Sequence, residues 1–362
     1  MAEGEAGLSA LLDRLREEAG APGAILGVAT GDGPVTVVAS GLADRETGQA
    51  LRPEDPYFLG SISKTYTAAA ILRLAEEGRL SLDDPVARFL PDFPEGGAIT
   101  IRHLLSHQSG LKDFYLYLYF RPERAEMVEL VTREWTEPEL LQLAGRFGRW
   151  FEPGTDWDYS NTNYYLLGVI AERAGGAPLP EIYRRLIYQP LGLTQTWLAW
   201  HEEARGELPT GYLGPVEGWK HSDMFGELGP TTVLDRSPVE WGAGGLAAPA
   251  AEGLRFLHGL FEGELLAPAS LEAMTRFRDT PPLGMSKEKG EGRPPDGYGL
   301  GLVRMSRAGM TVLGHGGLFT GHTSGLWHVP GRNLTIALYL NRGFVEQRPL
   351  LDQILAALPK AP

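Results

Sequence analysis

The sequence contains no cysteine. This absence excludes disulfide bonds, cysteine-ligated zinc, iron–sulfur clusters and a thiol nucleophile. No apolar run approaches 18 residues, so the sequence predicts no membrane span. Basic residues are fewer than acidic ones, 33 against 46, which gives a formal net charge of −13. Because such a surface repels a phosphate backbone, we expect no nucleic-acid partner.

The N-terminal residues lack the basic start and the apolar stretch of a signal peptide. Leu8, Leu11, Leu12 and Leu15 instead fall on one face of an amphipathic helix. We therefore expect a cytoplasmic protein. A removed signal peptide with an added Met is the alternative.

What the sequence does contain is typical of a globular protein with a large core: 43% hydrophobic and 22% charged residues over 362 positions. Residues 24–30 and 35–40 flank a GDGP turn and predict a β-hairpin. Further strand-like segments follow late in the chain, at 298–305, 311–314, 323–329 and 333–340. Helical patterns cover 61–80, 101–106, 138–145, 164–174, 179–186, 250–260 and 345–358.

This order of segments predicts a mixed α+β (α/β) fold. Strands joined by short turns pair antiparallel, and helices cover the resulting sheet. Residues 1–80 together with 241–362 would form the sheet domain, and 81–240 would form a mostly helical lobe. A catalytic cleft would lie between the two.

The pattern Ser-x-x-Lys occurs three times, although the chain has only six lysines. One instance, 286–289, lies in a charged stretch flanked by glycine, and another, 109–112, contains Gly110 and resembles a helix end. Only Ser61 and Lys64 open a strong helical pattern. Residues three apart on a helix share a face, and the first turn offers N–H groups to an oxyanion. Taken alone, this triplet fits a capping serine beside a solvated lysine better than a catalytic pair.

The flanking residues change that interpretation. Ser61 and Lys64 lie within FLGSISK (58–64), and further segments follow in order: IRHLLSHQSGL (101–111), EPG (152–154), YSN (159–161), PLGLTQT (190–196), GAGGL (242–246) and GHGG (314–317). Together they resemble the serine β-lactamase and penicillin-binding protein superfamily. The likeness is greatest to its class C branch, with D-aminopeptidases, DD-peptidases and family VIII carboxylesterases. The implied fold is the β-lactamase/transpeptidase type.

The resemblance implies roles for several residues. Ser61 would be the nucleophile and Lys64 its proton-relay partner. Tyr159 would be the shared general base and acid, and a tyrosine with a reference pKa of about 10 needs a nearby cation to act near neutral pH. Asn161 would bind Lys64 and a substrate carbonyl. The backbone N–H groups of Ser61 and Leu318 would form the oxyanion hole.

The triplet His315-Gly316-Gly317 would be the third motif of this superfamily, although on its own it also fits a tight turn. The two glycines would let a strand approach the substrate closely. Many superfamily members have Lys-Thr-Gly or His-Thr-Gly here, where a cation and a hydroxyl recognise a substrate carboxylate. Without the hydroxyl, a buried carboxylate lacks a donor. The motif therefore favours neutral esters or amides.

Two other features are explained more simply by structural roles than by chemistry. His103 and His107 are four residues apart, as helical metal ligands can be, but no third ligand is evident, so we expect structural roles and no metal or other cofactor. The segment 114–120 is rich in aromatic residues. It fits the core of a helix better than an apolar wall for a substrate.

The leading hypothesis is a serine hydrolase that acts through an acyl-enzyme on small ester or amide substrates, most like a carboxylesterase. A second hypothesis is a β-lactamase, a D-Ala-D-Ala carboxypeptidase or a D-aminopeptidase. A third is a non-catalytic penicillin-binding-like protein. The sequence leaves the oligomeric state open.

Overall fold

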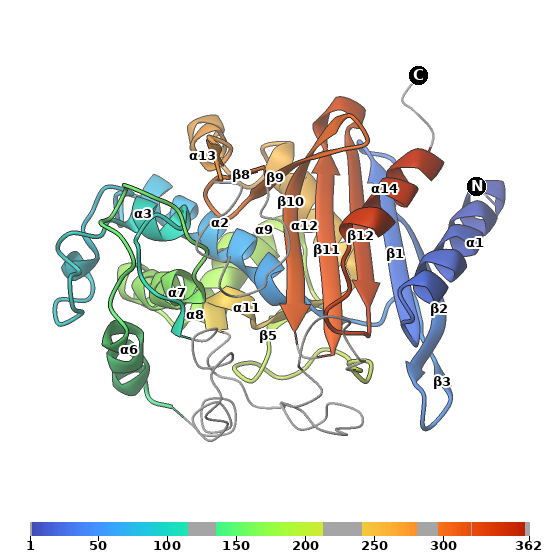
Figure 1. Ribbon diagram of the computed structural model, residues 1–362, viewed down its shortest axis with the longest axis horizontal. Coiled ribbons are helices and arrows are strands. Elements are labelled where there is room, and N and C mark those ends of the chain that lie inside the picture. Colours follow the sequence, from blue (N-terminus) through green and yellow to red (C-terminus); the bar gives the residue numbers. More distant parts are fainter. Residues whose placement is uncertain (1, 115–134, 213–240, 281–295, 320, 359–362) are drawn as a thin grey trace.

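A central β-sheet organises the structure, a computed structural model that describes residues 2–114, 135–212, 241–280, 296–319 and 321–358 (Figure 1). Within these residues, nine antiparallel strands follow the order β3-β2-β1-β12-β11-β10-β9-β8-β7. The strands are β1 (Gly23–Thr30), β2 (Thr36–Asp44), β3 (Gln49–Ala50), β7 (Arg278–Asp279), β8 (Gly297–Tyr298), β9 (Val303–Arg307), β10 (Met310–Phe319), β11 (His322–Val329) and β12 (Leu334–Leu340). The predicted antiparallel sheet and its N-terminal hairpin are confirmed.

Helices cover both faces of this sheet (Figure 1). Because successive residues of a strand point to opposite faces, Ile336 and Leu338 of β12 belong to one core, and Ala337 and Tyr339 to the other. The first core is shared with α1 and α14, and the second with α2 and α12. These helices are α1 (Ala2–Glu18), α2 (Ser63–Glu76), α12 (Ala250–Phe261) and α14 (Arg348–Ala357).

The described elements of the middle of the chain are mostly helices, as predicted. The described helices of this part are η2 (Val86–Arg88), α3 (Ile101–Leu105), α6 (Glu137–Arg146), α7 (Asn161–Gly175), α8 (Leu179–Tyr183), η3 (Arg184–Tyr188) and α9 (Gln189–Leu191). Three further short helices come later in the chain: α11 (Trp241–Gly244), α13 (Pro268–Met274) and η6 (Pro330–Arg332). One hydrophobic core runs without a break from Ala337 in the sheet to Leu167 in α7 and Leu104 in α3. The division into a sheet domain and a helical lobe therefore stays a prediction.

A second, small sheet was not predicted. It consists of the short strands β4 (Tyr57–Phe58), β6 (Leu246–Ala248) and β5 (Trp197–Leu198). Strands of two or three residues are too short to show an alternating pattern. This sheet ties the residues just before η1 (Gly60–Ile62) to the segment that follows α11.

One predicted strand is wrong in its extent. Residues 298–305 form two strands, β8 and β9, joined by a tight turn in which the Gly299 N–H bonds to the Leu302 carbonyl. Gly301 has a φ of +74°, a left-handed conformation that glycine adopts without strain. The predicted strand 311–314 is in turn longer, since β10 continues to Phe319.

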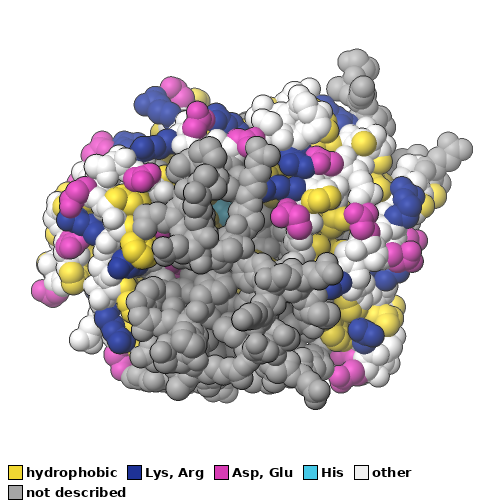
Figure 2. All heavy atoms as spheres, in the orientation of Figure 1, with side chains coloured by type: hydrophobic (Ala, Val, Ile, Leu, Met, Phe, Trp, Pro, Cys, Tyr) yellow, Lys and Arg dark blue, Asp and Glu magenta, His cyan; other side chains and the backbone are white. Residues whose placement is uncertain are grey.

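Other predictions concern the surface and the remaining segments. No described helix is long and apolar enough to cross a membrane. On the face in Figure 2, acidic and basic side chains are interspersed over the described surface. Of the aromatic segment 114–120, only Phe114 lies within the described residues, where it is buried against Tyr165. Residues 286–289 lie outside them.

Candidate active site

Ser61 lies in the short 3₁₀ turn η1, because α2 begins only at Ser63. The prediction that the α-helix opens at Ser61 is therefore wrong. Gly60, just before Ser61, has a φ of +51°, left-handed backbone that an α-helix cannot contain, and the chain makes one 3₁₀ turn between it and α2. A Cβ on Gly60 would also lie 2.8 Å from the backbone nitrogen of Leu318. The turn thus places Ser61 directly against β10.

Lys64 is fully buried and its side chain reaches Ser61. Its Nζ lies 3.0 Å from Ser61 Oγ, 2.7 Å from Asn161 Oδ1 and 2.7 Å from the carbonyl oxygen of Ala243. An ammonium ion donates to all three oxygens. A neutral amine donates to the last two and accepts the serine proton through its lone pair. Both protonation states fit these contacts, so a proton can pass between Ser61 and Lys64 without rearrangement.

Asn161 is the first residue of α7, and a buried carboxylate fixes its orientation. Asp113 Oδ2 accepts hydrogen bonds from the backbone nitrogen of Asn161 at 2.8 Å and from its Nδ2 at 2.9 Å. Since Nδ2 faces Asp113, Oδ1 faces Lys64. The predicted contact between Asn161 and Lys64 is therefore present. Nδ2 carries a second hydrogen, which is the one that a substrate carbonyl would use.

Tyr159 lies just before α7, beside Lys64. The Lys64 Nζ is 5.0 Å from the centroid of the Tyr159 ring, a distance at which a cation is attracted to an aromatic face. The Tyr159 ring lies 4.3 Å from the ring of His107 and 6.2 Å from that of His315. The structure thus brings Tyr159, Lys64 and Ser61 together. The lowered pKa of the phenol stays a prediction.

His315 is a buried, neutral imidazole. Its Nδ1 lies 2.6 Å from the carbonyl oxygen of Gly316, which can only accept, so Nδ1 carries the proton. Nε2 therefore accepts from the Tyr298 hydroxyl at 3.2 Å. Burial, reinforced by the positive charge of Lys64, lowers the pKa of His315 to about 3. The third motif consequently presents no cation at neutral pH.

The two glycines after His315 differ in their surroundings. A Cβ on Gly317 would lie 1.9 Å from the carbonyl oxygen of Leu59 and 2.2 Å from Ser324 Oγ. Gly317 is thus required for packing β10 against the residues before Ser61. The close approach of this strand to a substrate stays a prediction. A Cβ on Gly316 would meet nothing closer than 3.6 Å.

The last residues of β10 have one strand neighbour among the described residues. Pairing with β9 stops at Gly314, so within the described part of the chain residues 315–319 pair with β11 alone. Leu318, which is 42% exposed, lies on this stretch. The triplet is therefore strand and not a tight turn, and it runs beside the turn that carries Ser61.

The two histidines of α3 and its C-terminal flank have structural contacts. His103 Nδ1 accepts from the Thr100 N–H at 3.3 Å, and Thr100 Oγ1 accepts from the His103 N–H at 3.2 Å, which caps α3. His107 is bonded to the segment that carries Tyr159. Among the described residues, no three His, Cys, Asp or Glu side chains are grouped as metal ligands.

Comparison with known proteins identifies the family. The sequence model of the Beta-lactamase family matches residues 8–358. The chain belongs to this family. Esterase EstB of Burkholderia gladioli is 32% identical over 82% of this chain and 78% of its own length. A D-aminopeptidase of Cereibacter sphaeroides is 28% identical over 92% of this chain but only 59% of its own length.

Solved structures of the family agree with this fold. The D-amino acid amidase of Ochrobactrum anthropi SV3, complexed with L-phenylalanine amide, superimposes with a TM-score of 0.80 at 26% identity, covering 97% of each chain. The family members found are thus esterases, aminopeptidases, amidases and penicillin-binding proteins. This chain is a serine hydrolase of the same family.

Two groups in the site were not predicted. Asp113 comes two residues after the segment 101–111. A carboxylate so close to that motif could have marked Asp113 as a candidate site residue. The Ala243 carbonyl that accepts from Lys64 left no such signal, because every residue has a carbonyl and only the fold decides where it points. The motif GAGGL (242–246) is part of the family resemblance, but it did not predict that the Ala243 carbonyl faces Lys64.

Proposed function

We propose that this protein is a carboxylesterase-like serine hydrolase that acts on small, electrically neutral esters. The observation that carries the proposal is the contact of 3.0 Å between Ser61 Oγ and the Nζ of the fully buried Lys64. A serine hydroxyl within hydrogen-bond reach of a buried amine, in a turn packed against a strand, is the arrangement that nucleophilic catalysis needs.

In the proposed reaction, Ser61 Oγ attacks the ester carbonyl and its proton passes to Tyr159 through Lys64. The N–H groups of Ser61 and Leu318 hold the oxyanion that forms. When the tetrahedral intermediate collapses, the bond to the alcohol oxygen breaks and Tyr159 returns the proton to that oxygen. Water then attacks the acyl-enzyme and gives a proton to Tyr159. When this second tetrahedral intermediate collapses, the bond between the acyl carbon and Ser61 Oγ breaks and Tyr159 returns the proton to Oγ, which releases the acid and restores Ser61.

The preference for neutral substrates rests on His315. Its pKa of about 3 leaves the imidazole uncharged near neutral pH, and its two nitrogens already face Gly316 and Tyr298. Because a carboxylate without a charged or donating partner is costly to bury, the third motif gives little support to an anionic substrate. The likeness to esterase EstB supports the same choice.

The test is hydrolysis of p-nitrophenyl butyrate by the wild type and by Ser61→Ala, with nitrocefin run beside it. We expect ester turnover that disappears in the variant, and little cleavage of nitrocefin. Fast nitrocefin cleavage would contradict the role given to the third motif. An Ala variant that kept the wild-type rate would show that Ser61 is not the nucleophile.

A second candidate activity is hydrolysis of D-amino acid amides. It is favoured by the superposition on the D-amino acid amidase, which covers 97% of both chains. Such a substrate is cationic at its amino group, so it also needs no carboxylate site. Turnover of D-phenylalanine amide that exceeds turnover of the butyrate ester, and that is lost in Ser61→Ala, would establish this activity instead.

A further inference from the structure

The segment 158–163 carries two proposed site residues, yet its own secondary structure does not hold the first of them. Residues 156–160 form neither helix nor strand, and Ser160 is extended, with φ −144° and ψ 121°. Tyr159 thus lies outside the hydrogen-bond pattern of α7. The backbone on either side of it is instead held by His107, in the motif 101–111 to which the proposed mechanism gives no role.

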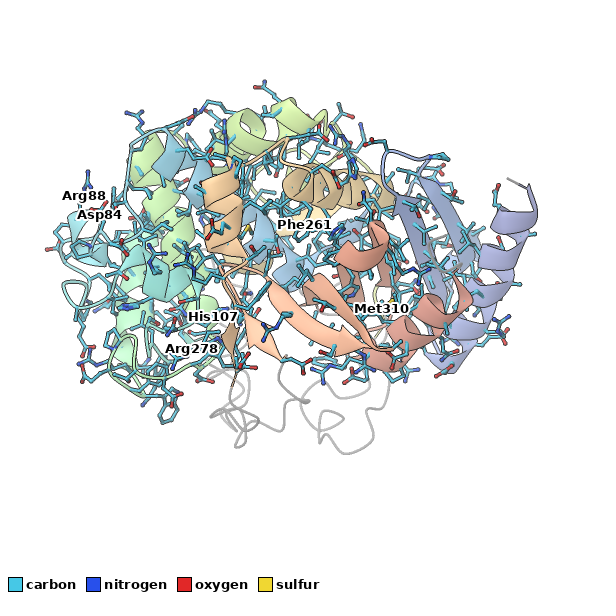
Figure 3. All side chains as sticks on the ribbon, turned by 90° about the horizontal axis from the view of Figure 1, so that it is seen from above. Asp84, Arg88, His107, Phe261, Arg278 and Met310 are labelled. Atoms are coloured by element: carbon cyan, nitrogen blue, oxygen red, sulfur yellow. The ribbon has the colours of Figure 1, made fainter. Side chains whose placement is uncertain are left out.

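His107 contacts both neighbours of Tyr159 and its ring. Its carbonyl oxygen accepts from the Asp158 N–H at 3.1 Å, and its Nδ1 lies 3.2 Å from the Ser160 nitrogen. Tyr159 is therefore held on both sides by one residue. Its ring also lies 4.3 Å from the imidazole, tilted by 39°. Figure 3 shows His107 where the helical part of the chain meets the sheet.

The hydrogen bonds of Asn163 define what His107 supplies. Asn163 Oδ1 accepts from the Ser109 hydroxyl at 2.6 Å, so its Nδ2 faces His107 Nδ1 at 3.0 Å. Nδ1 thus receives two N–H donors and must be unprotonated. The proton is on Nε2, which is buried and has no hydrogen-bond partner among the described residues. Burial, with the charge of Lys64, keeps the pKa of His107 well below its ordinary value.

The backbone of His107 is unusual as well. Its φ of +57° is left-handed, a conformation in which Asn, Asp and His are the side chains found most often. Such a conformation is strained for a residue other than glycine and persists where the surroundings fix it. The position therefore calls for a residue that tolerates positive φ and places an acceptor two bonds from its Cβ.

We infer that His107 is a positioning residue for the reaction proposed above, which acts through Tyr159 by holding the backbone on either side of it. It supplies an acceptor at Nδ1, and it neither touches the substrate nor exchanges a proton. This inference rests on the proposed function, since Tyr159 is the base in that mechanism.

Two substitutions separate the acceptor from the ring. His107→Asn places Oδ1 where Nδ1 lies, because both atoms are bonded to Cγ, and asparagine tolerates the left-handed backbone. His107→Leu fills a similar volume without an acceptor. If the Leu variant does not fold, His107→Gln replaces it, because its amide oxygen lies one bond too far out.

Kinetics of p-nitrophenyl butyrate hydrolysis give the first readout. We expect His107→Asn to keep kcat within about threefold of the wild type. We expect His107→Leu to lower kcat on the order of 100-fold with little change in KM, as a misplaced catalytic group does. In a Tyr159→Phe background, His107→Leu should cost little more, because the group it positions is already gone.

Three outcomes would overturn the inference: a Leu variant with wild-type kcat, an Asn variant as impaired as the Leu variant, or an equal loss with and without the Tyr159 hydroxyl. Failure of the proposed function looks different, since Ser61→Ala or Tyr159→Phe would then keep the wild-type rate.

Hydrogen exchange of the peptide that spans 155–163 gives a readout that needs no substrate. We expect faster exchange of the Asp158 and Ser160 amides in His107→Leu but not in His107→Asn. Equal exchange in all three proteins would show that His107 does not hold this segment, whatever the enzyme hydrolyses.

Discussion

Acid should destabilise this protein through His315, and the size of the effect follows from its surroundings. The imidazole is 5% exposed and its pKa is about 3, whereas an unfolded histidine titrates near 6.5. Between these values the unfolded chain binds a proton that the folded protein refuses, so stability is kept above about pH 6.5 and falls as the pH approaches 3. At about 1.4 kcal/mol per pH unit, the loss is about 2 kcal/mol at pH 5 and about 5 kcal/mol at pH 3.

The assay is urea unfolding at a series of pH values for the wild type and for His315→Gln, which cannot be protonated. The other histidines whose pKa values burial lowers, His103, His107, His201 and His328, are present in both proteins, so the difference between the two curves isolates the effect of replacing His315. We expect the stability of the wild type relative to the variant to fall by about 2 kcal/mol between pH 7.5 and pH 5. Parallel curves for the two proteins would refute a neutral, buried His315.

Nuclear magnetic resonance of histidine labelled with ¹⁵N gives a second, direct measurement. The hydrogen bonds of His315 predict that Nδ1 carries the proton and that the ring stays neutral at pH 5. A His315 resonance that titrates near pH 6.5 would contradict this, and with it the argument for neutral substrates.

Three further predictions concern the groups around Ser61. Tyr159→Phe should slow acylation at least about 100-fold with little change in KM, measured by the pre-steady-state burst, and an equal loss in binding would show that the phenol only positions substrate. Gly316→Thr should fold and raise acylation by carboxylate-bearing β-lactams relative to neutral esters, and an unchanged ratio would contradict the third-motif argument. Gly317→Ala should lose activity, because its Cβ would overlap Leu59. Asp113→Ala should lower kcat and cost about 1–3 kcal/mol in urea unfolding, because two part-buried N–H groups of Asn161 lose their acceptor. Wild-type values would show that Asp113 does not orient that amide.

The sequence predicted the long elements of this fold well, because helices such as α2 and α12 and strands such as β1 and β12 are long enough to show a period. The sequence did not predict element boundaries that depend on the backbone angle of one glycine. Gly60 turns the chain into η1 before α2, and Gly301 splits one strand-like run into β8 and β9.

The site shows the same limit. The motifs indicated four candidate residues that the structure brings together, because the type of each side chain can be read directly from the sequence: Ser61, Lys64, Tyr159 and Asn161. The neutrality of His315 could not be, because it depends on burial and on the distance to Lys64, which only the folded chain sets.

The strand order has a consequence for the synthesis of this protein. β1 pairs with β2 on one side and with β12 on the other. The second edge of β1 therefore stays unpaired until β12 is synthesised, about 300 residues later. At about 5–20 residues per second, the ribosome takes some tens of seconds to deliver it. During that time the edge of β1, rich in Ala, Ile, Leu and Val, is open to pairing with other chains.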